Sequence, residues 1–111
     1  MPIVEGDLIP IRARIGIGAV TPLAPGQRIG FRTGLKFAVP LDHVLQLHLP
    51  DDLAEQGIVL CKTLVPPNDG RELILTMVNM DMNAWPVEIR HNQVCAIGVI
   101  KQTKAVGPFK A

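Results

Sequence analysis

The side chains able to do chemistry are few and scattered in this 111-residue chain. His43 and His48 are five residues apart, so on one strand they point to opposite faces and could not share a metal ion. Asp69 could act as a general base, but an aspartate before a glycine, here Gly70, is more typical of a turn. There is no Ser-His-Asp set, phosphate-binding loop or CxxC pair. These residues alone predict no catalytic or metal site.

The two cysteines, Cys61 and Cys95, lie inside apolar runs. Such surroundings are typical of buried thiols, and a disulfide framework in a chain this short would need more cysteines. We therefore expect two free, buried thiols.

Three further side chains could contact a partner. Trp85 precedes Pro86 and could anchor an interface, since tryptophan is enriched at interaction hot spots, or it could simply pack in the core. Met80 and Met82 flank Asp81 and could form an adaptable contact tip, or an ordinary loop with partly buried methionines. The sequence leaves both choices open.

Short apolar stretches between turn signals predict an all-β fold, a compact barrel or sandwich. Several stretches alternate: Leu35, Phe37 and Val39 face one way, and Lys36 and Ala38 the other. Likewise, Leu45, Leu47 and Leu49 oppose Val44, Gln46 and His48. The best helical candidate is a single turn at Asp51–Gln56, capped by Asp51 or Asp52. The expected strands are Arg28–Arg32, Leu35–Val39, Val44–Leu49, Ile58–Leu60, Glu72–Asn79, Val87–Arg90 and Val94–Lys101.

Two strands and both chain ends are expected to meet other molecules. Leu73–Val78 and Val94–Ile100 are apolar on both faces, as in strands covered by a second sheet or another subunit. Met1–Val20 has no clear period, and we interpret it as an extended arm that pairs along a neighbouring edge. Ala105–Ala111 forms a second short arm. The interface candidates are Ile9, Ile11, Arg12, Arg14, Trp85, Val94, Ile97, Val99 and Phe109.

The composition agrees with a small subunit of an assembly. Hydrophobic residues make up 48% of the chain and aromatic residues 4%, a high aliphatic load for one small domain, so some of it is expected to meet another subunit. Lys and Arg number 11 against 10 Asp and Glu, so the net charge predicts neither nucleic acid nor a membrane as partner. Met1–Arg14 lacks the pattern of a signal peptide, and its charges interrupt every candidate span, so an intracellular product is expected.

From Pro22 onward, the order of signals resembles the dUTPase and dCTP deaminase superfamily. The matching segments are Pro22–Gly26 (like LxPG), Thr33–Pro40 (like PTGLxIxIP), Val44–Pro50, Gln56–Leu60 (like HGIxL), Gly70–Asn79 (like YxGxLxIxVxN), and Val87–Ile89 with Val94–Ile97 (like FxIxxGxRIAQL). The resemblance implies a compact, dUTPase-like β-barrel that is often a threefold-symmetric trimer. It divides the chain into an N-terminal arm (1–20), a barrel domain (21–104) and a C-terminal tail (105–111).

The family's catalytic motifs have no counterpart here. Arg14–Ala19 has no carboxylate where the family has a Gly-x-Asp-Leu pattern that holds Mg²⁺. Asp51 and Asp52 stand where the family's Arg and Ser bind phosphate, and two carboxylates would repel a triphosphate. The third motif has proline at or beside the catalytic Asp, the chain has no Tyr, and His91–Ala96 lacks the family's Arg and Gln. We expect no enzyme activity, no catalytic residue, and no cofactor or metal.

Three functions fit these observations. The first is a noncatalytic trimeric structural protein, most plausibly a viral capsid decoration or cement protein on a virion surface, with a capsid shell protein as partner. The second is a phage or host-directed module that binds a protein or a nucleotide, in the cytoplasm. The third is a divergent nucleotide hydrolase. Fold does not fix function, so the lost charges and the apolar excess favour the first.

Overall fold

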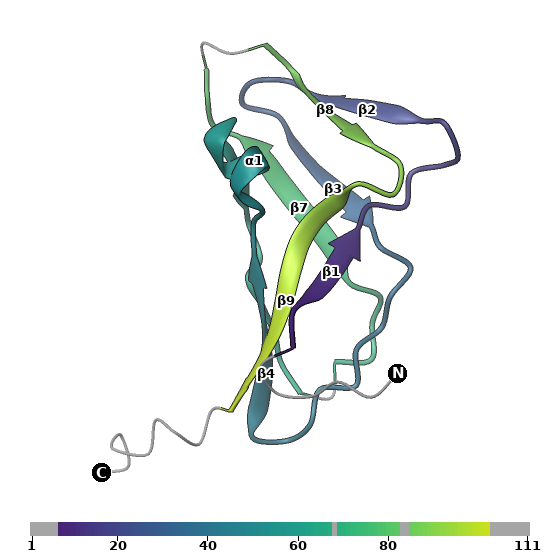
Figure 1. The fold of residues 1–111 in the computed structure, drawn as a ribbon, viewed down its shortest axis with the longest axis vertical. Helices are drawn as coiled ribbons and strands as arrows, with labels where there is room; N and C mark the ends of the chain where they lie inside the picture. Colours follow the sequence, from purple (N-terminus) through teal and green to yellow (C-terminus); the bar gives the residue numbers. More distant parts are fainter. Residues whose placement is uncertain (1–6, 68, 83–84, 103–111) are drawn as a thin grey trace.

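Short strands and one helical turn build the described part of the chain, residues 7–67, 69–82 and 85–102 of a computed structural model (Figure 1). In chain order the elements are β1 (Ile9–Arg12), β2 (Val20–Leu23), β3 (Arg28–Arg32), β4 (His43–His48), α1 (Asp51–Glu55), β5 (Ile58–Leu60), β6 (Leu64–Val65), β7 (Ile74–Asn79), β8 (Val87–Arg90) and β9 (Val94–Gln102). The predicted all-β fold class is therefore confirmed.

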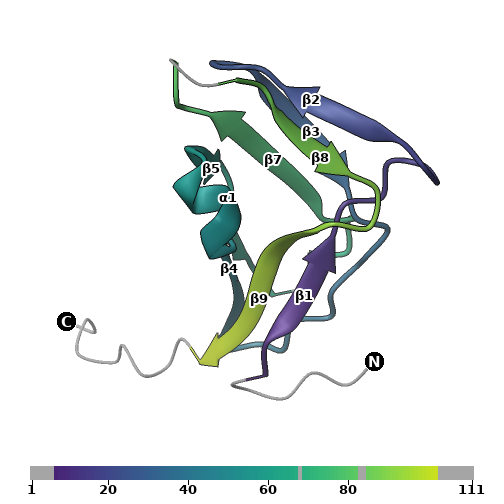
Figure 2. The ribbon, with the colours of Figure 1, turned by 45° about the horizontal axis from the view of Figure 1, so that its top comes forward.

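The strands form three sheets, in the orders β1-β9-β4-β6, β3-β7-β5 and β2-β8. Every pairing between these strands is antiparallel. Figures 1 and 2 show the β2–β8 ribbon at one end of the molecule, beside β3. In the described residues, no helix reaches the length and apolar character of a membrane span.

One hydrophobic core joins the two larger sheets. Ile11, Leu45 and Ile100 enter it from the four-stranded sheet, and Phe31 and Met77 enter it from β3 and β7. Fully burying an aliphatic or aromatic side chain contributes about 1.5–3 kcal/mol, so these contacts account for much of the stability. The expected alternation along β4 is confirmed, because Leu45 and Leu47 are buried while Val44 and Gln46 are only partly covered.

Three of the seven expected strands have the predicted bounds, namely Arg28–Arg32, Ile58–Leu60 and Val87–Arg90. Val44–Leu49, Glu72–Asn79 and Val94–Lys101 overlap β4, β7 and β9 with ends shifted by one or two residues. β6, at Leu64–Val65, was not expected, because two residues carry too short a pattern to detect.

Leu35–Val39 is not a strand, so this prediction is wrong. The expected alternation holds for Phe37 and Val39, which are buried, and for Lys36 and Ala38, which are exposed, but not for Leu35, which is 36% exposed. However, the chain leaves the β3 ladder after Arg32, where Gly34 takes a φ of 70° that favours glycine. The segment is then held by single bonds such as Leu73 N–H to Leu35 O at 2.8 Å.

Part of the N-terminal segment, which we expected to be an extended arm paired along a neighbouring edge, pairs within its own chain. Ile9–Arg12 is β1, which pairs with β9 of the same chain, and Ile11 is 0% exposed. Because Ile11 packs in the core of its own subunit, it is not available to a partner. Val20 begins β2, which pairs with β8. Residues 1–6 lie outside the described part of the chain.

The helical turn α1 is present, but its cap is neither aspartate. Pro50 takes the N-cap position without a side-chain bond, and its carbonyl accepts the N–H groups of Leu53 and Ala54 at 3.1 and 3.0 Å. Proline suits this position because it lacks an N–H and favours the observed extended backbone. Asp51 and Asp52 follow in the first turn and are exposed.

The two thiols lie in different environments. Cys95 is buried, as expected, and burial raises the pKa of its thiol to about 11, so the reactive thiolate is strongly disfavoured. Cys61 is exposed, and the prediction that it is buried is wrong. Ile58 and Leu60 occupy the core side of β5, so the alternation of side chains places Val59, which is 48% exposed, and Cys61 on the outer side.

Candidate functional site

A groove lies between the extended segment 36–40 and the turn at residues 69–73. It consists of two adjoining hollows of about 280 and 520 Å³, which share Phe37 and Asp69. The smaller hollow is lined by Phe37, Lys62, Val65, Asp69, Arg71, Glu72, Leu73, Ile74 and Thr76. Charged groups of both signs therefore meet an apolar wall, the usual character of a binding pocket.

Asp69 is the sequence-predicted candidate that reaches this groove, and its side chain is 8% exposed. Its Oδ1 accepts bonds from the Arg71 backbone N–H at 3.2 Å and the Arg71 Nε–H at 3.0 Å, while Lys62 Nζ lies 3.7 Å from Oδ2. The side-chain bond from Arg71 is the main cause that lowers the pKa of Asp69. A carboxylate that is held in this way is a weak general base. Asp69 therefore works here as a turn anchor, since its Oδ1 binds the backbone two residues on.

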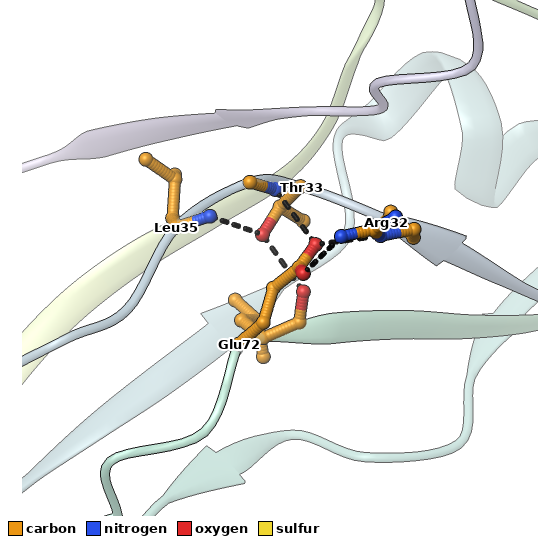
Figure 3. A network of polar contacts seen from close by, with 6 residues as sticks. Arg32, Thr33, Leu35 and Glu72 are labelled. Carbon is orange, nitrogen blue, oxygen red and sulfur yellow. Dashed lines mark hydrogen bonds and ion pairs between the residues drawn. The ribbon is translucent and has the colours of Figure 1, made fainter.

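A second carboxylate, Glu72, joins the end of β3 to the start of β7 (Figure 3). Arg32 donates to both of its oxygens, from Nη2 at 2.8 Å and Nε at 3.2 Å, and Gly34 N–H donates to Oε2 at 3.0 Å. Beside this pair, the buried Thr33 hydroxyl donates to Leu73 O at 2.7 Å and accepts from Leu35 N–H at 3.1 Å. The network fixes the point where segment 33–40 leaves the sheet and so positions Phe37 in the groove.

The Glu72 ion pair makes stability depend on pH. Hydrogen bonding by Arg32 is the main cause that lowers the pKa of Glu72 from 4.5 to about 2. On acidification, Glu72 is therefore protonated in the unfolded chain before it is protonated in the folded chain. Its contribution to the free energy of unfolding is present above pH 4.5 and is lost as the pH falls toward 2. We expect Glu72→Gln to lower the Tm at pH 7 and to reduce the loss of Tm between pH 5 and pH 2.5, measured by circular dichroism.

Glu88→Gln is the matched control, because Glu88 is 58% exposed and lies 3.9 Å from Arg90 in a looser pair. It should leave the acid dependence close to that of the parent protein. Equal acid sensitivity in the parent and in Glu72→Gln would contradict the role assigned to the Arg32–Glu72 pair.

The segment matched to the family's metal motif, Arg14–Ala19, connects β1 and β2 and carries no carboxylate. Its backbone is tied to the β8–β9 turn instead, since Ile15 N–H and Gly16 N–H donate to His91 Nδ1 at 3.1 and 3.0 Å. Two backbone N–H groups and a histidine nitrogen do not fit Mg²⁺, which requires oxygen ligands. Within residues 7–67, 69–82 and 85–102, no three His, Cys, Asp or Glu side chains are placed to hold a metal ion.

Three interface candidates lie on β9 and remain partly exposed: Val94, Ile97 and Val99. Ile97 and Val99 lie opposite His48 and Gln46 on β4, on the face of the sheet that points away from the core. β9 is therefore apolar on both faces, as expected. One face packs in the subunit core, and the other face is partly exposed.

The other interface candidates lie in different environments. Ile9 packs partly against the core. Arg12 is exposed and donates to Asn92 O at 2.9 Å, and Arg14 lines a hollow of about 180 Å³ beside Arg32 and Glu72. Trp85 is 88% exposed, so it does not pack in the core of its own subunit. Phe109 lies outside the described residues.

Sequence reasoning missed the groove residues Lys62, Arg71 and Glu72, and it missed Arg32, which pairs with Glu72. Arg32 and Glu72 are 40 residues apart, and they meet because β3 pairs with β7 in the register that places Arg32 opposite Ile74. Of these contacts, only the Asp69–Arg71 pair could have been predicted from neighbouring residues in the sequence. An aspartate in a turn can bind an arginine two positions later.

No protein-family model matches this chain, and no curated protein sequence matches it. Solved structures do match. The dUTPase from phage phi11 of S. aureus has a TM-score of 0.71 at 12% identity, over 92% of this chain and 80% of that chain. The dUTPase from Streptococcus mutans has a TM-score of 0.63 at 19% identity, over 84% and 75%. The EIAV dUTPase has a TM-score of 0.69 at 12% identity, over 86% of each chain.

These likenesses show the fold, which is dUTPase-like, as the order of sequence motifs implied. At identities of 12–19% they show nothing more about this chain.

Proposed function

We propose that this chain is a noncatalytic, homotrimeric structural protein of the kind that decorates a viral capsid. The observation that carries the proposal is the outer face of the sheet β1-β9-β4-β6. Leu45, Leu47 and Ile100 point to the core, so their neighbours Val44, Ile97 and Val99 point outward. This outward set is aliphatic and only partly covered, and Leu64 on β6 extends it with 50% of its surface exposed.

We infer that a second copy of the chain packs against this face. Interface cores are apolar and depleted of charge, and the strand centres here present Val44, Gln46, Ile97 and Val99. Charged residues such as Lys101 lie toward the strand ends, where a polar rim is expected. The family resemblance supports three copies, because members of the superfamily often form threefold trimers.

The groove chemistry supports the absence of catalysis. Its nearly buried carboxylate, Asp69, already accepts bonds from Arg71 and lies near Lys62, so it is poorly suited to activate water. Asp51 and Asp52 are exposed on α1 and would repel a nucleoside triphosphate. The structural neighbours are dUTPases, and identities of 12–19% are compatible with loss of that activity.

The capsid role is the more specific part of the proposal. Phage proteins are among the structures that share this fold, which supports a viral source. A trimer also suits a threefold position on a shell, because three weak contacts acting together gain by effective concentration. Co-sedimentation of the full chain with assembled shells of the encoding virus tests it, and absence of the chain from purified particles contradicts it.

We expect the purified protein not to consume dUTP with Mg²⁺, at concentrations where the Streptococcus mutans dUTPase, used as the positive control, converts all substrate. Ion-exchange chromatography of the nucleotides measures the reaction. The physical reason is the lack of a free base and of metal-binding carboxylates at the matched positions. Turnover that disappears in Asp69→Asn would show instead that Asp69 is catalytic and that the proposal is wrong.

A further inference from the structure

The loop after β7 presents three large apolar side chains to solvent. Met80 is 61% exposed, Met82 is 68% exposed and Trp85 is 88% exposed. Three chain steps of 3.8 Å keep the Cα atoms of Met82 and Trp85 within about 11 Å of each other. We call Met80, Met82 and Trp85 the methionine–tryptophan surface. Methionine adapts to varied partners and tryptophan anchors interfaces, so these side chains are suited to binding.

The base of this surface is built rigidly around Asn79, which is 0% exposed. Asn79 Nδ2 donates to Leu23 O at 3.1 Å, and its Oδ1 accepts the Asp81 N–H at 3.1 Å. Its backbone carbonyl accepts the Gly26 N–H at 2.7 Å. These bonds fix the start of the loop before any partner arrives, which reduces the entropy cost of binding.

Two close contacts hold the surface against its neighbours. Met80 N–H donates to Gly57 O at 2.8 Å, and a Cβ at Gly57 would lie 2.7 Å from Asp81 Cβ, so residue 57 must be glycine for the loop to sit there. Met82 lies over the turn at Gly26, where an added Cβ would be 3.5 Å from Met82 Cε. The exposed apolar atoms are therefore held out by the fold.

Carboxylates border the same surface. Asp81 lies within it, and α1 ends two residues before Gly57 and carries Asp51, Asp52 and Glu55, all exposed. Figures 1 and 2 show α1 beside the end of β7, where the loop starts. Exposed carboxylates that border one surface give it a negative potential, which attracts cations and repels anions.

We propose that the methionine–tryptophan surface and the carboxylates of α1 bind a basic protein segment that carries apolar anchors. The apolar atoms require leucine-like or aromatic side chains, and the carboxylates require lysine or arginine between them. Nucleic acid and anionic lipid do not fit, because both are repelled by the acidic border. This binding surface is separate from the face that the trimer proposal uses.

Trp85 allows a direct test because it is the one tryptophan in the sequence. The probe is a synthetic amidated peptide of leucine and lysine in a helical repeat, and its partner control has glutamate in place of lysine. With the lysine peptide, we expect a saturable blue shift of Trp85 emission that weakens with added salt. With the glutamate peptide, we expect no shift.

Variants then test the apolar side chains and the carboxylates of the surface separately. Met80→Ser with Met82→Ser should lower the affinity about tenfold or more, because a buried side chain of this size contributes at least that factor. Asp51→Asn with Asp52→Asn should reduce both the affinity and its salt dependence. The matched controls, Leu41→Ser, at a leucine 68% exposed, and Asp7→Asn, lie away from the surface and should leave the affinity unchanged.

Four outcomes would overturn the proposal. Equal shifts with both peptides would show binding without charge selection. A shift with phosphatidylcholine vesicles would identify a lipid surface, and a shift on concentrating the protein alone would identify a second copy of the chain. No shift with the lysine peptide at millimolar concentration would show that the surface does not bind such segments. Far-ultraviolet circular dichroism of each variant confirms that it is folded.

Discussion

Replacing Asn79 by alanine is expected to lower the free energy of unfolding by about 2–5 kcal/mol. The side chain is fully buried and makes two hydrogen bonds, to Leu23 O and from Asp81 N–H. Alanine leaves both backbone groups without their partner and leaves a small cavity. A domain of this size is stable by about 5–15 kcal/mol, so the loss is a large share of the total. Urea denaturation followed by circular dichroism measures it.

Asn79→Asp separates the hydrogen bonds from simple packing. The carboxylate keeps the acceptor for Asp81 N–H but loses the donor to Leu23 O, and burial raises its pKa in the folded state. Its stability should therefore improve relative to the parent as the pH falls through that raised pKa, because the protonated acid can again donate to Leu23 O.

Gln27→Ala is the matched control for the Asn79 variants. It removes one exposed bond, from Ala24 N–H to Gln27 Oε1 at 2.8 Å, and should cost about 0.5–1 kcal/mol. Similar losses for Asn79→Ala and Gln27→Ala would contradict a central role for Asn79, and would also weaken the rigid base assigned to the methionine–tryptophan surface.

Val99→Asp is expected to convert the proposed trimer into single chains of 12.1 kDa, measured by size-exclusion chromatography with light scattering. Val99 lies at the centre of β9 on the outer face, opposite Gln46. Burying an unpaired carboxylate costs several kcal/mol at each subunit contact of the proposed trimer. The single chain should remain folded, because Val99 points away from its own core.

Val59→Asp controls for adding a charge to an exposed strand. Val59 is 48% exposed on β5, in the three-stranded sheet, so its substitution should leave the proposed trimer intact. A parent protein that is a monomer at micromolar concentration, or a Val99→Asp variant that remains trimeric, would show that this face is not the interface.

The sequence by itself determined which side chains face the core along most strands. Alternation of side chains is a local property, because successive residues of an extended chain point to opposite sides wherever the strand pairs. Leu45 and Leu47 are therefore buried as predicted, and so are Phe37 and Val39, although their segment is not a strand. The ordered motifs from Pro22 onward likewise indicated the dUTPase-like fold that the solved structures share.

The tertiary structure alone decided which segments pair and what lies at the surface. Ile9–Arg12 had no detectable period, yet β9 supplies the hydrogen-bond partner that makes it a strand. Arg32 and Glu72 meet only through the β3–β7 register, and the bonds made by Asn79 and Gly57 fix the loop that begins at Met80. Strand pairing and the solvent exposure of side chains depend on residues tens of positions away in the sequence. The residues around Ile9, Arg32 or Trp85 therefore do not predict them.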